Sequence, residues 1–109
     1  MDTLLQEHPT STIPKAARRA LIELTGQVEL GPAVLITMKD AIEYRLEGIA
    51  SQIDAYERRY GMTFKQFDAS GSRGDLPDPT SYQTEQDYFE WDGLMTRQQK
   101  LGDILQWLA

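Results

Sequence analysis

The sequence predicts an all-α protein: a long antiparallel helical hairpin of coiled-coil type, with an N-terminal helix and a short helical turn in its connection. Residues 34–60 and 82–108 carry apolar stripes at helical spacing over equal lengths. A stretch with two Gly and two Pro, residues 70–81, separates them as a loop. The length of 109 residues suits a single helical domain, residues 1–109, and 24 of them are Leu, Ile, Val or Phe, enough for a thin core.

The N-terminal third of the chain predicts one helix after a frayed tail at residues 1–9. Hydroxyl residues at positions 10–12, followed by Pro14, are typical of a helix start. We therefore expect a helix over residues 13–25, and we expect Gly26 to end it.

The segment that follows is interpreted as a connection. Residues 27–33 include Gly31 and Pro32, which favour a turn. The composition at Val28–Leu30 is also compatible with a short strand. The sequence offers no partner strand for it, and an isolated strand is not stable.

The strongest pattern in the sequence is the stripe within residues 34–60, which Gly61 ends. After Leu35, its apolar residues follow one another at steps of 4, 3, 4, 3 and 4, and they are Ile42, Leu46, Ile49, Ile53, Tyr56 and Tyr60. This spacing is that of the buried seam of a coiled coil. It predicts one continuous helix in which Leu46, Ile49 and Ile53 are buried.

A second helix of matching length is predicted over residues 82–108. Thr80 or Ser81 is expected to cap it, with Glu85 near its first turn. Its stripe consists of Tyr88, Trp91, Leu94 with Met95, Gln98, Leu101, Leu105 and Leu108. In the connection, residues 63–67 predict a helical turn whose two Phe side chains close the open end of the hairpin.

Composition and charge exclude several classes of function. The chain has no Cys and a single histidine, His8, so thiol chemistry, a disulfide or a two-histidine metal site cannot form. The net charge of −6 argues against a nucleic-acid binder, and Lys15, Arg18 and Arg19 are too few for DNA binding by this chain alone. No apolar run is long enough to span a bilayer, and the N-terminus is acidic. We therefore expect a cytoplasmic protein without membrane contact.

The last third of the chain concentrates negative charge, because residues 76–109 hold six acidic and two basic residues. Its acidic cluster consists of Glu85, Asp87, Glu90 and Asp92. Carboxylates that project from several helices can hold a metal. These four do not share one clean face, and no Glu-Glu-x-x-Glu motif occurs, so we expect no metal, no cofactor and no enzymatic activity. A solvated acidic face, or one that meets a basic partner, is the favoured interpretation.

One aromatic residue lies apart from the predicted core. Phe89 is about 100° round the helix from Tyr88, beside the acidic residues. Aromatic side chains ringed by charges are typical of the residues that dominate binding energy at protein interfaces. We therefore expect Glu85, Phe89, Glu90 and Asp92 to contact a basic protein partner. The alternative is that Phe89 belongs to the core of this chain.

Two stretches carry a family resemblance. They are Tyr56-Glu-Arg-Arg-Tyr60-Gly-Met-Thr-Phe64-Lys-Gln-Phe67, and Gly74-Asp-Leu-Pro77 followed by Glu85-Gln-Asp-Tyr-Phe-Glu-Trp-Asp-Gly-Leu94. Over about residues 50–101 the chain resembles small helical antitoxin-like proteins of prokaryotic toxin–antitoxin pairs. The resemblance implies that the protein neutralises a cognate toxin, which is expected to be a ribonuclease. The N-terminal third shows no ribbon-helix-helix pattern, so no operator-binding role follows.

Two other functions stay open from the residues alone. One is a Mg²⁺-dependent helical nucleotide hydrolase that uses carboxylates. The other is a structural homo-oligomer, because a two-helix hairpin leaves part of both stripes uncovered and a small chain gains from a second copy. We expect a homodimer or higher oligomer when no partner is present.

Overall fold

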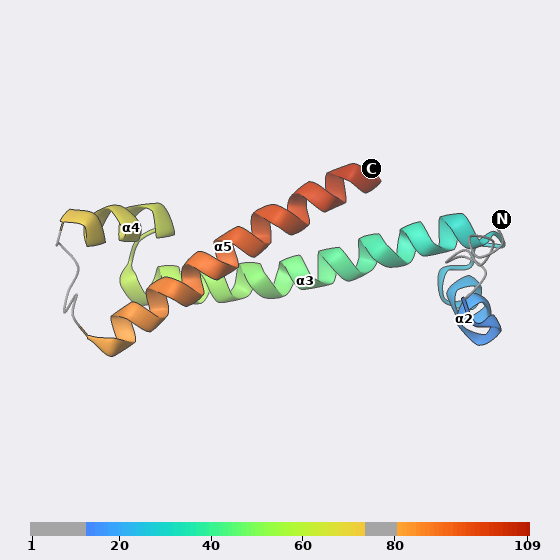
Figure 1. The fold of residues 1–109 in the computed structure, drawn as a ribbon, viewed down its shortest axis with the longest axis horizontal. Coiled ribbons are helices and arrows are strands. Elements are labelled where there is room, and N and C mark those ends of the chain that lie inside the picture. Colours follow the sequence, from blue (N-terminus) through green and yellow to red (C-terminus); the bar gives the residue numbers. More distant parts are fainter. Residues whose placement is uncertain (1–12, 74–80) are drawn as a thin grey trace, which may run out of the picture. The chain divides into compact units, whose positions relative to one another are not determined.

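The computed structural model describes residues 13–73 and 81–109. Within these residues the chain forms four helices and no strand: α2 (Lys15–Thr25), α3 (Leu30–Tyr60), α4 (Phe64–Arg73) and α5 (Tyr82–Leu108) (Figure 1). The all-α fold class predicted from the sequence is confirmed. The chain divides into two compact units, residues 1–41 and 42–109, and each is described by itself. The predicted tail with His8, and the hydroxyl residues at positions 10–12, lie outside the described residues.

In the first unit, α2 starts two residues later than predicted. Pro14 is its N-cap, in extended conformation, and no side chain caps the helix there. The C-terminal end is as predicted, because Gly26 adopts the left-handed conformation with φ 73°. Its N–H donates to the carbonyl oxygen of Ile22 at 2.9 Å and closes the last turn. No residue of α2 is buried.

The start of α3 differs from the sequence prediction. The helix begins at Leu30 instead of residue 34, so the connection is shorter and the strand considered at residues 28–30 does not form. The reason is that Pro32 lies in the first helical turn, where N–H groups have no helical acceptor and the missing donor costs nothing. Ala33 follows and is fully buried, and its N–H donates to the backbone carbonyl oxygen of Glu29 at 3.2 Å.

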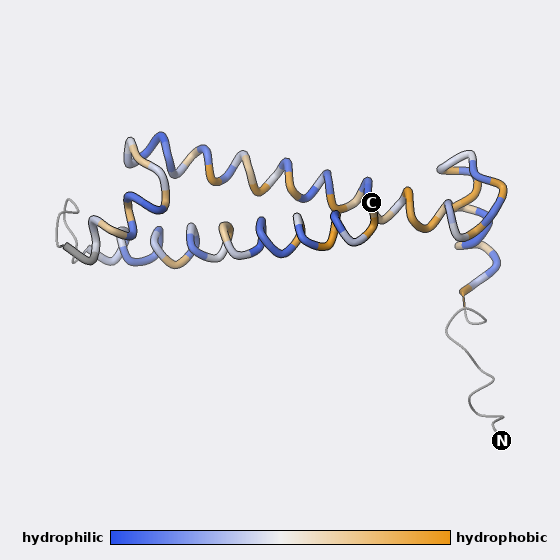
Figure 2. The backbone as a smooth tube through the Cα atoms, turned by 90° about the horizontal axis from the view of Figure 1, so that it is seen from above, coloured by the Kyte–Doolittle hydropathy of each residue, from blue (hydrophilic) through white to orange (hydrophobic). Residues whose placement is uncertain are grey.

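The second unit is the predicted hairpin. Residues 42–60 of α3 and the whole of α5 run in opposite directions and pack on one another (Figures 1 and 2). The buried core consists of Ile42, Ile49 and Ile53 from α3, Phe67 from α4, and Trp91 and Leu101 from α5. Leu46, predicted to be buried, is partly buried against this core. The predicted stripes of both helices are therefore the surfaces that meet.

The connection of the hairpin contains a longer helix than predicted. Gly61, with φ 67°, ends α3, and α4 starts with a reciprocal cap. The N–H of Thr63 donates to Gln66 Oε1 at 2.9 Å, and the N–H of Gln66 donates to Thr63 Oγ1 at 3.2 Å. This cap starts a helix that continues through Gly71 to Arg73, so the loop predicted at residues 70–81 begins too early. Residues 74–80 lie outside the described part of the chain.

The start of α5 is the predicted one. Ser81 is the N-cap, and its Oγ accepts from the N–H of Thr84 at 3.0 Å. Glu85 lies in the first turn, where a negative charge interacts favourably with the helix dipole. Among residues 13–73 and 81–109, no single helix is both long enough and apolar enough to cross a membrane. Within the same residues, only α2 and α3 taken together meet the length and apolarity of a membrane span, and this pair is bent by 70°.

Candidate protein-binding surface

The first half of α5 is held in place by an aromatic cluster around Trp91. This side chain has no exposed surface. Its ring lies 5.1 to 6.0 Å, centroid to centroid, from the rings of Tyr56, Tyr60, Phe64 and Phe67. Because these rings come from α3 and α4, all three helices of the hairpin meet at Trp91. The outer face of α5 therefore belongs to a helix that is packed on α3 and α4.

A buried carboxylate adds a polar link at the same level. Asp87 is only 1% exposed. Its Oδ2 accepts from Arg59 Nη1 at 2.8 Å and from the Tyr60 hydroxyl at 2.5 Å, and its Oδ1 accepts from Gln83 Nε2 at 2.8 Å. Both oxygens are therefore satisfied by donors, as a buried carboxylate requires. The prediction that Asp87 belongs to a solvated acidic face is therefore wrong.

Two pKa shifts reflect this environment. Burial raises the pKa of the Asp87 carboxyl, but its three hydrogen bonds and the charge of Arg59 lower it more. The net pKa lies below the ordinary value, so Asp87 is ionised at neutral pH. Burial, the hydrogen bond to Glu90 and the negative charges of Glu90 and Asp87 raise the pKa of Tyr56 to about 12. Tyr56 therefore stays protonated and acts as a donor.

The four residues predicted to contact a partner all lie on α5, and all are exposed: Glu85, Phe89, Glu90 and Asp92. We call them the Phe89 surface. Phe89 is 65% exposed, and its ring meets Tyr88 edge-on at 5.6 Å between centroids. Glu85 and Asp92 lie four residues before and three residues after it, so the three side chains share one face of the helix.

The other acid of the Phe89 surface lies on its α3 side. Glu90 Oε1 accepts a hydrogen bond from the Tyr56 hydroxyl. Within the Phe89 surface, this hydrogen bond directs the Glu90 carboxylate toward α3. No group of three or more His, Cys, Asp or Glu residues suited to a metal occurs in the described parts of the chain.

Two features of this region lie outside the predictions made from the sequence. Tyr82, seven residues before Phe89 and thus on the same face, is 76% exposed and extends the aromatic surface by two turns. The role of Asp87 had a signal in the sequence, because it lies four residues before Trp91 on the core side of α5. No local sequence pattern identifies Arg59 and Tyr60 as the donors to Asp87, because that pairing depends on the register between α3 and α5.

Comparison with known proteins adds no relative. The sequence matches no protein-family model and no curated protein, and no solved structure matches it.

Proposed function

We propose that this protein is a non-enzymatic, cytoplasmic binding protein that neutralises a basic partner protein, as an antitoxin neutralises its toxin. The Phe89 surface is the proposed contact. The partner class is the one that the family resemblance implies, a toxin with ribonuclease activity.

The observation that carries the proposal is the exposure of Phe89 among carboxylates. A large apolar ring in water gains free energy when a partner covers it. Single exposed apolar residues are common on proteins, so exposure alone would mean little. Here Tyr82 lies on the same face, and two exposed carboxylates, Glu85 and Asp92, flank Phe89 along that face. Aromatic side chains, Phe among them, are enriched at the centre of protein interfaces, where a polar rim surrounds them.

The charge of the surface indicates the chemistry of the partner. The Phe89 surface carries three carboxylates and no basic residue, on a chain of net charge −6. A ribonuclease needs a basic cleft to hold the phosphates of RNA. An acidic helix placed over such a cleft is electrostatically complementary and excludes the substrate. The field would also speed the encounter and make it depend on salt.

The packing beneath the surface favours tight binding. Trp91 and Asp87 fix the first half of α5 against α3 and α4, so the Phe89 surface is ordered before the partner arrives. Little conformational freedom is then lost on association. We therefore expect a partner to meet a preformed helix face.

The experiment uses the product of the neighbouring gene, provided that it is a small basic protein. We expect this product to cleave RNA in vitro, and we expect equimolar addition of the full chain to abolish the cleavage. The variant Phe89→Ala should restore most of the cleavage at the same concentrations. The variant Tyr44→Ala, which removes another exposed aromatic side chain from α3, should inhibit as well as the wild type.

Absence of inhibition by the wild-type chain would contradict the antitoxin proposal. Inhibition that Phe89→Ala leaves intact would contradict the assignment of the surface. Magnesium-dependent hydrolysis of nucleotides by the chain itself would favour the alternative of a hydrolase.

A further inference from the structure

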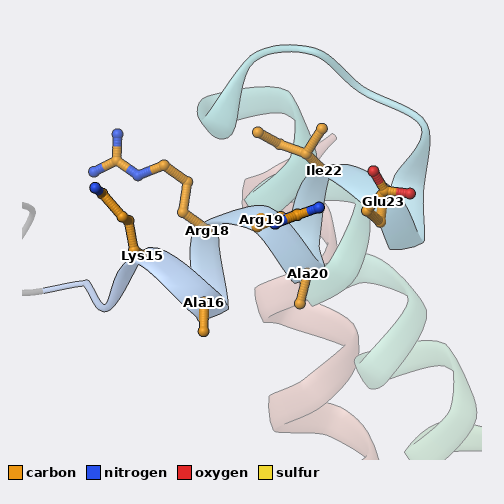
Figure 3. A pocket seen from close by; sticks show the side chains of 7 residues that line it. All are labelled: Lys15, Ala16, Arg18, Arg19, Ala20, Ile22 and Glu23. Atoms are coloured by element: carbon orange, nitrogen blue, oxygen red, sulfur yellow. The ribbon is translucent and has the colours of Figure 1, made fainter.

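A hollow on α2 has the opposite character to the Phe89 surface. Its volume is about 650 Å³, and it is lined by Lys15, Ala16, Arg18, Arg19, Ala20, Ile22 and Glu23 (Figure 3). Three of these side chains are basic, three are apolar and one is acidic. Lys15 and Arg18 extend to the same side of α2, and Ala16 and Ala20 point to the other side (Figure 3). No residue of α2 is buried, so the helix presents this hollow to solvent.

The two surfaces match in charge. The hollow offers Lys15, Arg18 and Arg19 as three exposed cations, and the Phe89 surface offers three exposed carboxylates. Interfaces in which opposite potentials meet associate faster and with better specificity. The cations lie on α2 and the carboxylates lie on α5, so the two sets of charges belong to separate helices.

The two surfaces also match in shape and length. Phe89 protrudes from α5, with 65% of its surface exposed, and the hollow on α2 contains one larger apolar side chain, Ile22, on the same side of the helix as Lys15 and Arg18 (Figure 3). The helix α2 has 11 residues, and the segment from Tyr82 to Asp92 has the same number, so both are about 16 Å long. One α2 can therefore cover the exposed face of α5 from Tyr82 to Asp92.

We propose that α2 of one copy of this chain docks on the Phe89 surface of a second copy, with Phe89 seated in the hollow of α2. This proposal rests on the proposed function in one respect, because it gives a second occupant to the same Phe89 surface. The contact is head-to-tail, because it joins two different patches of the same chain. It covers the exposed ring when the partner is absent.

A regulatory consequence follows from the shared surface. Self-association and partner binding both need Phe89, so each excludes the other at that surface. The partner therefore dissociates the self-associated form, and high concentration of this protein slows capture of the partner. Both equilibria weaken as salt rises, because each depends on exposed opposite charges.

The test exploits the two different patches. One full-length variant carries Arg18→Glu with Arg19→Glu and loses the basic patch of α2. A second carries Glu85→Lys with Asp92→Lys and loses the acids of α5, while Glu90 stays in its hydrogen bond with Tyr56. Sedimentation equilibrium measures self-association of each variant and of an equimolar mixture. A control with Arg45→Glu and Lys65→Glu has the same net charge as the first variant, with both changes at exposed positions of α3 and α4.

The wild type and the control should self-associate at micromolar concentration, whereas each patch variant alone should associate roughly a hundredfold more weakly. The mixture should regain association, because the α2 of the second variant meets the α5 of the first. A monomeric wild type would overturn the proposal. So would patch variants that associate like the wild type, or a mixture that stays monomeric while both variants keep wild-type helix content and melting temperature.

The same variants separate this proposal from the proposed function. The first patch variant keeps its Phe89 surface, so it should still bind the product of the neighbouring gene with undiminished affinity. Complementation in the mixture without any partner binding would leave self-association standing and refute the antitoxin role. Binding of the partner without complementation in the mixture would support the antitoxin role and refute self-association through α2.

Discussion

Asp87 is a buried polar side chain whose hydrogen bonds should contribute measurably to the stability of the hairpin. Its carboxylate accepts three hydrogen bonds while almost fully buried. We expect Asp87→Asn to lower the free energy of unfolding by roughly 2 kcal/mol at neutral pH, since hydrogen bonds to a charged group are worth more than neutral ones. Chemical denaturation of the full chain at pH 7 measures this difference.

The same variant tests the direction of the pKa shift. The pKa of Asp87 is lowered by folding, so its contribution to stability is complete above the ordinary carboxyl value of 3.8 and is lost as pH falls below it. The stability difference between wild type and Asp87→Asn should therefore shrink below about pH 4. Asp54→Asn is the matched control, because Asp54 pairs with Arg58 at an exposed site and should contribute little. A difference that persists unchanged at pH 3 would contradict the assignment.

Two glycines of the hairpin should respond in opposite ways to alanine. At Gly48, within α3, an added methyl group meets no other atom within 4 Å, so Gly48→Ala should raise the free energy of unfolding by about 1 kcal/mol through helix propensity. At Gly61 the backbone has φ 67°, so Gly61→Ala should lower it by a similar amount. Thermal melts of both variants check the pair. Stabilisation by both substitutions would contradict the conformation given for Gly61.

The helix α3 depends on its apolar stripe, and Ile49 lies at the middle of that stripe. It is buried in the core with Ile42 and Ile53. Ile49→Asp should unfold the hairpin, because an unpaired buried carboxylate costs several kcal/mol, a large share of the stability of a small protein. Ala50→Asp, at the adjacent exposed position, should melt near the wild-type temperature. Circular dichroism distinguishes the two, and equal melting temperatures would refute the burial of the stripe.

The helices could be predicted from the sequence where a periodic pattern extended over many residues. The stripe of α3 and that of α5 are of this kind, and both were placed on the correct faces. The ends of helices depend on short-range details and were less predictable. Gly31 and Pro32 predict a connection, but Pro32 lies in the first turn of α3, a position that suits proline. The capping pair of Thr63 and Gln66 starts a helix of 10 residues, longer than the turn predicted at residues 63–67.

The candidate site was predictable in part for the same reason. Phe89 lies off the periodic stripe, so its exposure followed from helix geometry. The hydrogen bonds of Asp87 and Glu90 connect α5 to α3 across the hairpin. Such contacts depend on the register of two helices that are distant in sequence, and no local pattern fixes that register. The hollow on α2 likewise depends on the positions of side chains rather than on residue types.

Considered as a whole, the chain combines a packed hairpin with a surface that the packing does not use. Trp91 and Phe89 are two residues apart on α5, yet one has no exposed surface and the other is 65% exposed. Trp91→Ala should therefore lower the free energy of unfolding by about 3–5 kcal/mol. Phe89→Ala should leave the melting temperature and helix content nearly unchanged. This contrast separates a residue that holds the fold from one that is free to bind.

The central claim is that Phe89 anchors a protein partner, and the affinity of that partner tests it most directly. Isothermal titration would measure the Kd of the neighbouring gene product for the wild type, Phe89→Ala and Tyr44→Ala. We expect Phe89→Ala to bind about thirtyfold more weakly, because losing an interface anchor commonly costs about 2 kcal/mol, and Tyr44→Ala to bind like the wild type. Equal affinities for the wild type and a folded Phe89→Ala would contradict the claim.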